Sequence, residues 1–177
     1  MSIQLNIKRA RVLLILCSVL MLFSCSKDRE YSFFVAGHVY GSPDFDSGGI
    51  YPSFMETFAS LNEDDLMEYG FLAGDIVKHP SEESWDKTEE DLKELNMPIT
   101  FAPGNHDLKD YDLYCERYGP IGRYFFHAGD LFVIPEVLMD GWVISPEQIA
   151  FFNELVEKNE ERIKNIFVIV HQVIFSD

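Results

Sequence analysis

Hydrophobic and polar positions follow two different rhythms along the chain after residue 30. Short apolar and aromatic runs, each closed by Gly, Pro or a polar residue, are typical of β-strands, and they occupy residues 31–36, 69–73, 98–102 and 165–170. Stretches with apolar residues at helical spacing among charges predict helices at residues 52–61, 81–95 and from 145 onward. Residues 124–127 and 131–134 flank Ala-Gly-Asp, which predicts a hairpin with a three-residue turn. Strands that alternate with helices favour an α/β layered domain.

The last of these helices has the clearest start. Ser145 suits the N-cap, Pro146 suits the first helical position, and Glu147 places an acid in the first turn. The expected apolar face consists of Ile149, Phe152, Leu155 and Val156. The pattern therefore predicts a helix with one buried face.

The first 24 residues form a different kind of segment, which we interpret as a signal peptide. A basic start is followed by a predominantly apolar stretch at residues 12–23, which is shorter than the roughly 20 residues that span a bilayer. The ending Leu22-Phe23-Ser24-Cys25 resembles the lipobox of bacterial lipoproteins. That resemblance implies a lipidated Cys25, a tether at residues 25–30 and anchoring at the inner or outer membrane of the bacterial cell envelope. An ordinary secretory signal or an uncleaved anchor are the alternatives.

Charge and cysteine content narrow the possible partners. The whole chain carries a formal net charge of −16, and removal of the signal, with Lys8, Arg9 and Arg11, makes it three units more negative. Such an acidic protein is not expected to bind nucleic acid or anionic lipid headgroups. A lipid would hold it at the membrane without help from charge. Cys115 has no disulfide partner outside the predicted signal and lipidation site.

Four of the apolar runs end in polar residues that suit metal chemistry: Gly37-His38, Gly74-Asp75, Gly104-Asn105-His106 and His171. In open α/β sheets, ligands gather at the carboxyl ends of strands. Carboxylate, imidazole and amide groups together suit Mn, Fe or Zn. Each residue alone has a simpler explanation, such as a turn residue, a helix cap or a core histidine. Their repetition at four strand ends favours a shared metal site.

These blocks resemble the calcineurin-like metallophosphoesterase family. Gly74-Asp75 is similar to the second block of the family, Gly104-Asn105-His106-Asp107 matches its GNH[DE] block, and His171 stands where a later metal-binding histidine is expected. The resemblance runs from about residue 33 to residue 175. It implies an α/β fold in which a layered β-sandwich is flanked by helices, formed by residues 31–177.

The resemblance also implies a mechanism. The family binds two divalent metal ions, and Asp75 would bridge them. Asn105 and His171 would ligate one ion and His38 the other. A hydroxide between the metals attacks the phosphorus of a phosphate mono- or diester. His106 and Asp107 would be the catalytic residues, and His106 would stabilise the phosphoryl group and protonate the leaving oxygen. The expected partner is thus a phosphorylated small molecule or another phosphoester.

Two departures from the family pattern concern the metals. Ala36 stands where the first block of the family has an aspartate ligand, so the ion held by His38 would need a substitute such as Asp44 or Asp46. The C-terminal Gly-His-x-His block of the family has no counterpart here. We therefore expect one or two metal ions, an incomplete second sheet, and a chain that is a fragment of a longer protein with weak or no activity of its own.

Other polar and aromatic residues match nothing in the pattern. His79 and His127 are interpreted as surface or rim residues, Trp85 and Trp142 as packing residues, and Lys78 as solvent-facing near the metal loop. Besides the enzyme, two hypotheses stay open. One is a non-catalytic cell-envelope lipoprotein that uses this fold to bind a ligand or partner, which Ala36 favours. The other is an α/β domain without a metal.

Overall fold

A computed structural model describes residues 29–42, 44, 48–138 and 143–172. The predicted signal peptide, Cys25, Asp46 and Trp142 lie outside these ranges, so the structure does not test their interpretation. Within the described ranges, no helix has the length and apolar character needed to cross a membrane.

The described chain contains two three-stranded sheets. The strands of the first sheet are all parallel, in the order β1-β2-β3: β1 (Ser32–Ala36), β2 (Met67–Ala73) and β3 (Ile99–Ala102). The second sheet has the order β4-β5-β8: β4 (Arg123–His127), β5 (Asp130–Ile134) and β8 (Asn165–Val168). In it, β5 runs antiparallel to β4 and parallel to β8. A small two-stranded sheet joins β6 (Val137–Leu138) to β7 (Val143–Ile144).

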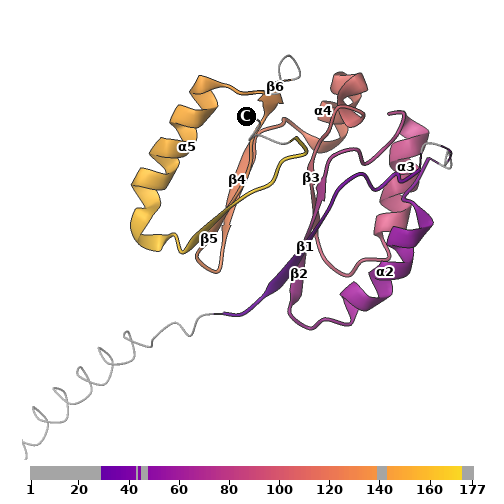
Figure 1. Ribbon diagram of the computed structural model, residues 1–177, viewed down its shortest axis with the longest axis horizontal. Coiled ribbons are helices and arrows are strands. Elements are labelled where there is room, and N and C mark those ends of the chain that lie inside the picture. The colour runs from indigo at the N-terminus through magenta and orange to yellow at the C-terminus, as the bar shows by residue number, and fades with distance from the viewer. Residues whose placement is uncertain (1–28, 43, 45–47, 139–142, 173–177) are drawn as a thin grey trace, which may run out of the picture.

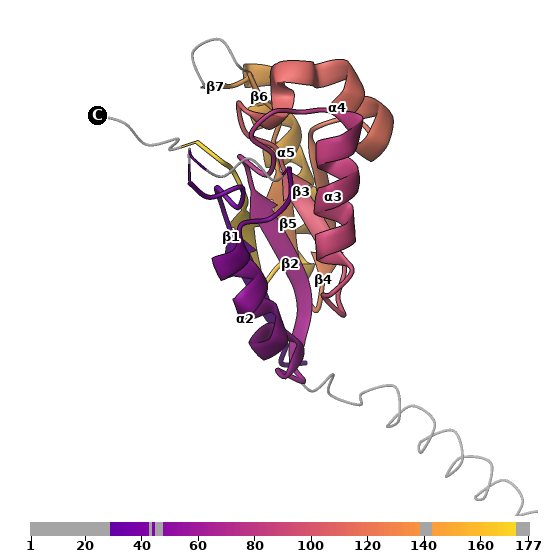
Figure 2. The ribbon, with the colours of Figure 1, turned by 90° about the vertical axis from the view of Figure 1, so that its right-hand side faces the viewer.

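Helices cover the outer faces of both sheets, which makes a four-layer sandwich (Figures 1 and 2). The first sheet is covered by three helices: α2 (Pro52–Asn62), α3 (Glu82–Leu92) and α4 (Tyr111–Tyr118). The second sheet is covered by α5 (Pro146–Asn159). Two short 3-10 helices are η1 (Asp107–Asp110), which leads into α4, and η2 (Glu160–Arg162), which follows α5.

Local sequence explains where the helices begin. The Ser81 side chain accepts a hydrogen bond from the backbone N–H of Ser84, and the Ser84 side chain accepts one from the backbone N–H of Ser81, which forms a capping box at α3. Ser145 caps α5 in the same way through the N–H of Gln148, with Pro146 next. Because these caps satisfy free N–H groups at the first turn, both predicted helix starts are confirmed.

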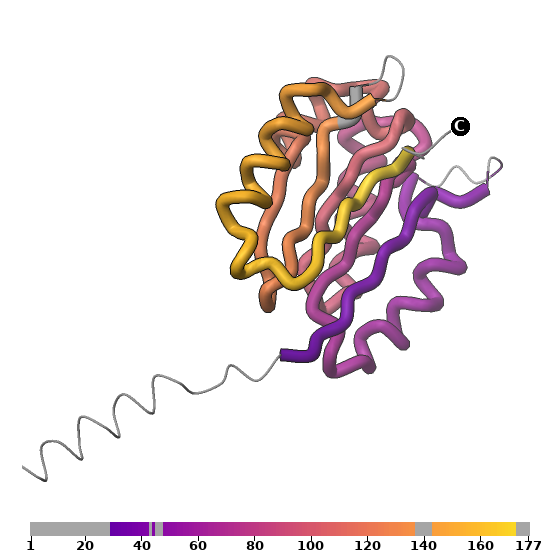
Figure 3. Tube along the Cα trace, turned by 60° about the vertical axis from the view of Figure 1, so that its left-hand side comes forward, coloured from indigo at the N-terminus to yellow at the C-terminus, as the bar shows by residue number. Residues whose placement is uncertain are grey.

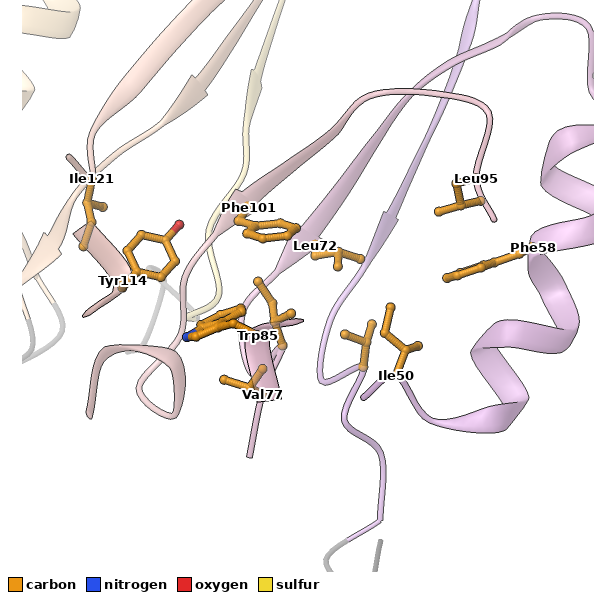
Figure 4. Packing of buried hydrophobic residues seen from close by; sticks show 11 residues of the cluster. Ile50, Phe58, Leu72, Val77, Trp85, Leu95, Phe101, Tyr114 and Ile121 are labelled. Carbon is orange, nitrogen blue, oxygen red and sulfur yellow. The ribbon is translucent and has the colours of Figure 1, made fainter. Parts of the chain in front are cut away.

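The core lies in three layers that follow the alternation of side chains along the strands. Between the sheets, Phe71 of β2 and Phe132 of β5 are fully buried and stack with ring centroids 5.1 Å apart. The neighbouring Leu72 points the other way, into the cluster under α2 and α3 that is drawn in Figure 4. Trp85 of α3 is fully buried in that cluster, so its interpretation as a packing residue is confirmed. Leu131 and Leu155 form a third cluster beneath α5.

The predicted fold class is confirmed, but several details differ. The hairpin turn has two residues rather than three, because His127 pairs directly with Asp130 and both turn residues, Ala128 and Gly129, have positive φ. Ile149 was expected on the buried face of α5 but is about half exposed. The helix α4 and the pair β6–β7 were not predicted. The second sheet has three strands, and Ile166 and Val168 on β8 are half exposed.

Candidate active site

The carboxyl ends of β1, β2, β3 and β8 lie at the same end of the sandwich, where the predicted polar blocks follow them (Figure 3). Asp75, just after β2, is the centre of this group and its side chain is only 6% exposed. One carboxylate oxygen lies 3.1 Å from Nδ1 of His38, and the other lies 3.4 Å from Nε2 of His171. The backbone N–H of His106 donates to Asp75 at 3.2 Å. Three blocks far apart in sequence therefore meet at one carboxylate.

The backbone is strained at two of these residues. His38 has φ 58° and Asp75 has φ 53°, in the left-handed region that residues with a Cβ rarely adopt. The two loops are joined by a hydrogen bond of 2.8 Å from the N–H of His38 to the carbonyl of Gly74. Strain of this kind costs roughly 1–3 kcal/mol per residue and persists only where the surroundings impose it, which happens most often at functional sites.

Two glycines at the site are required by crowding, and Gly74 is also required by its backbone conformation. A Cβ at Gly74, whose φ is +76°, would lie 2.3 Å from Cγ of His171. A Cβ at Gly104 would lie 2.7 Å from Oδ1 of Asp75 and 2.8 Å from Cδ2 of His171. Only glycine lets the loops after β2 and β3 approach His171 this closely.

Hydrogen bonds to backbone carbonyls orient both His171 and His106. Nδ1 of His171 lies 3.0 Å from the carbonyl of Ala73, and Nδ1 of His106 lies 2.8 Å from the carbonyl of Lys78. A carbonyl only accepts, so each Nδ1 carries the proton, and Nε2 is left for other partners. For His171 that nitrogen faces Asp75, which is the arrangement of a metal-binding histidine held by a carbonyl. The Nζ of Lys109 also approaches Nδ1 of His106, at 3.1 Å, and competes with that tautomer.

Asp107 was predicted as a catalytic residue, but it is fully buried and cannot touch a substrate. Its Oδ1 accepts from the N–H groups of Ile76 (2.8 Å) and Val77 (3.0 Å), and its Oδ2 accepts from Gly104 (2.7 Å). Burial raises the pKa of Asp107 to about 6, against the opposing effect of these three hydrogen bonds. The structure thus corrects its role: Asp107 holds the loop after Asp75 against the turn at Gly104.

The remaining predicted residues lie around this centre. Asn105 is half-buried in the turn between Gly104 and His106, and both of these neighbours approach Asp75. Ala36 ends β1 and supplies only a methyl group. Asp44, considered as a substitute ligand, is exposed, and its N–H donates to Ser42. Lys78 contributes its backbone carbonyl to His106.

The donor chemistry fits a divalent metal better on one side of Asp75 than on the other. Asp75, Asn105 and His171 offer a carboxylate, an amide and an imidazole of suitable tautomer. On the other side, His38 has Ala36 where an acidic ligand would be needed. Among the described residues, no three or more His, Cys, Asp or Glu side chains are arranged as a ready metal cage. Instead, His38 and His171 each make a separate contact with the carboxylate of Asp75.

One residue at the site was missed by sequence reasoning. Tyr40 is buried, and its ring contacts the rings of both His38 and His106. Burial, together with the charges of Asp75 and Asp107, raises its pKa. The only signal in the sequence was an aromatic residue in the loop that follows His38. The two unmatched histidines lie elsewhere: His79 is exposed, and His127 is a largely buried residue at the opposite end of the sandwich.

Comparison with known families agrees with this geometry. The family model described as calcineurin-like phosphoesterase matches residues 38–134. This match covers more than half of the chain, so the protein belongs to the calcineurin-like phosphoesterase family. It includes His38, Asp75 and the block from Gly104 to Asp107, while His171 lies beyond it. No curated protein matches the chain.

Proposed function

We propose that this protein is a metal-dependent phosphoesterase that hydrolyses a phosphate mono- or diester. The observation that carries the proposal is the meeting of His38 and His171 at the carboxylate of Asp75, beside the turn that bears Asn105 and His106. Family membership supports the same reaction class, because the family consists of metallophosphoesterase hydrolases. The substrate would be a phosphorylated small molecule or another phosphoester.

The residues that would hold metal follow from the donors on the two sides of Asp75. Asp75, Asn105 and His171 would bind one Mn, Fe or Zn ion, and His38 with Asp75 would bind a second more weakly. A divalent cation held there would supply Lewis-acid activation of the phosphoester and of water. The burial of Asp75 favours ion binding, since its carboxylate is removed from solvent.

His106 would serve the leaving group. Its Nδ1 is engaged with the carbonyl of Lys78, so its Nε2 is available to a substrate oxygen. The imidazolium form would carry the proton that the leaving oxygen needs, and its charge would stabilise the transferring phosphoryl group. The backbone N–H of His106 donates a hydrogen bond to Asp75 and so holds His106 beside the carboxylate that would bind metal.

The cellular setting is part of the proposal. A lipid on Cys25 would tether the domain to a membrane of the bacterial cell envelope through residues 25–30. The strongly acidic composition supports a small phosphoester over a nucleic acid as the substrate, because a polyanion would be repelled.

A non-catalytic binding protein is the second candidate. Ala36 favours it, since the ion held by His38 lacks an anionic terminal ligand. In that case the same end of the sandwich would bind a ligand or a partner protein without turnover.

Hydrolysis of chromogenic phosphomonoester and phosphodiester substrates in Mn²⁺ separates the two. If the protein is an enzyme, we expect turnover to fall about 100-fold or more in Asp75→Asn. Mutation of groups that only support metal ligands already lowers metal affinity or activity 10- to 100-fold. The matched control is His79→Asn, which changes an exposed histidine outside the site and should have no effect. Manganese binding by calorimetry without turnover would favour the binding protein, and the absence of both manganese binding and turnover would leave only a binding role that needs no metal.

A further inference from the structure

Tyr40 joins two histidines that come from different loops. Its ring centroid lies 4.4 Å from that of His38, at an interplanar angle of 44°, and 5.2 Å from that of His106, at 41°. Tyr40 is only 8% exposed, whereas the side chain of His38 is 54% exposed. The buried ring of Tyr40 therefore packs against the more exposed imidazole of His38.

The loop that carries Tyr40 is itself held firmly. The N–H of Gly41 donates to the carbonyl of His38 at 3.0 Å, and the N–H of Tyr51 donates to the carbonyl of Val39 at 2.8 Å. A Cβ at Gly41 would lie 2.2 Å from Cγ of Tyr51, so the loop is packed tightly on its far side. Tyr40 is thus anchored through the backbone and packing of its loop, and not through the rings of the two histidines it touches.

The two histidines have few other restraints on their rings. Among the residues that the structure describes, the ring of His38 has one polar contact, at 3.1 Å to Asp75, and its left-handed backbone is one that a side chain tolerates poorly. His106 has its bond to the carbonyl of Lys78, with which Lys109 competes. In each case the polar contacts reach only Nδ1, so the ring can still tilt about that atom. A flat, buried ring packed against both removes that freedom.

We infer that Tyr40 is a positioning residue whose ring holds His38 and His106 in a fixed mutual arrangement. The inference rests on the proposed function, in which His38 binds a metal ion and His106 serves the leaving group. Tyr40 contacts His38 and His106 ring to ring, so the role belongs to the ring and not to the hydroxyl. A phenylalanine should replace it, and an aliphatic residue of similar volume should not.

The experiment compares Tyr40→Phe and Tyr40→Leu with the wild-type chain. The first readout needs no activity: ¹⁵N NMR of the neutral imidazoles reports which ring nitrogen carries the proton. We expect His106 to stay in the Nδ1–H tautomer in wild type and Tyr40→Phe, and to become a mixture in Tyr40→Leu. The second readout is steady-state kinetics in Mn²⁺. We expect kcat to fall about 10- to 100-fold in Tyr40→Leu with KM changed less than about threefold, because a misplaced catalytic group costs up to about 100-fold.

The control for a general loss of stability is Tyr118→Leu. Tyr118 packs against Trp85 and Phe101, with ring centroids 5.0 Å away in each case, and lies outside the site. It should lower the melting temperature and leave both the tautomer of His106 and kcat as in wild type. Equal effects of Tyr118→Leu and Tyr40→Leu would overturn the inference.

Two further outcomes are decisive. An unchanged tautomer in Tyr40→Leu overturns the positioning role whether or not the protein turns over a substrate. A loss in Tyr40→Phe as large as in Tyr40→Leu overturns the assignment to the ring. Absence of turnover in wild type would overturn the proposed function alone, because the tautomer measurement would still support or reject the packing role of Tyr40.

Discussion

The two ends of the sandwich use the same kinds of polar residues in opposite ways. At the carboxyl ends of the parallel strands, Asp75 meets His38 and His171 on loops with left-handed backbone and no room for a side chain at Gly74. Half of the His38 imidazole remains open to solvent. This end is strained and keeps polar atoms available.

At the other end, aspartate and histidine contact partners through both carboxylate oxygens and both ring nitrogens. Asp130 accepts hydrogen bonds from Tyr31 at 2.5 Å and from Asn165 at 2.8 Å. His127 is 14% exposed and contacts Glu68 at 2.8 Å with one nitrogen and the hydroxyl of Tyr69 at 3.2 Å with the other. His127 and Asp130 both belong to regular strands, where their backbone is unstrained.

The difference teaches how to separate stability from function in this fold. Polar groups on regular strands that contact partners across the interface link the two sheets and stabilise the sandwich. Polar groups on strained loops, with oxygen and nitrogen atoms left over, are the ones that can take a ligand. Residue type alone does not distinguish the two, because both ends contain histidine beside a carboxylate.

The largest loss of stability should come from adding a side chain at Gly74, in the site. Gly74→Ala adds a Cβ 2.3 Å from the ring of His171 at a φ of +76°, so we expect a loss of about 3 kcal/mol in the free energy of unfolding. Urea denaturation measures it, and metal binding should weaken as well. The control is Gly119→Ala, which has a φ of +80° but nothing within 4 Å of the new Cβ. If both variants lose the same amount, backbone conformation and not crowding at the site explains the glycine.

Removal of a carboxylate at the opposite end should cost slightly less and leave the site intact. Asp130→Ala breaks the hydrogen bonds from Tyr31 and Asn165 in a buried position, so we expect a loss of about 2–3 kcal/mol. Calorimetric titration with Mn²⁺ should give the wild-type affinity under conditions where the variant is folded. A weakened affinity would show that the two ends are coupled and would contradict the comparison.

Asp107 gives the site end a pH dependence of its own in the metal-free protein. Its pKa rises from 3.8 to about 6 on folding, so the folded state binds more protons than the unfolded state between these values. The stabilisation of the folded state by protonated Asp107 is therefore complete below about pH 4 and is lost as pH rises through about 6. Between pH 4.5 and 7 the change should be about 2 kcal/mol. Urea denaturation at both pH values should show this change in wild type and not in Asp107→Asn; an identical change in both would refute the assignment.

The smallest effect should follow from weakening the contact between the sheets at His127. Glu68→Gln keeps the size of the side chain but removes the charge that faces His127 and Arg29, so we expect a loss of about 1 kcal/mol. Thermal unfolding measures it, and Mn²⁺ affinity should not change. A gain in stability would show that burying this carboxylate costs more than its contacts return.

Much of the fold follows from local patterns. Helix starts at Ser81 and Ser145 are set by caps within four residues, and the strands are set by apolar runs that end in glycine, proline or a polar residue. The sequence did not predict the short pair β6–β7 or the helix α4, because their hydrophobic patterns are weak. The predicted length of the hairpin turn was wrong, because that length depends on pairing across the turn. Ile149 was misplaced because helical spacing does not say how much of a face a sheet can cover.

By itself, the sequence determined which residues could form a site, since an apolar run followed by a ligand residue recurs at His38, Asp75, Asn105 and His171, with a glycine before the first three. Only the tertiary structure decided that Asp75 contacts His38 and His171, and that Tyr40 packs against the rings of His38 and His106. It also decided that Asp107 is buried. These contacts join residues dozens of positions apart, such as His171 and Ala73, and close approach of distant loops depends on how the sheets pack. No local periodicity encodes that packing.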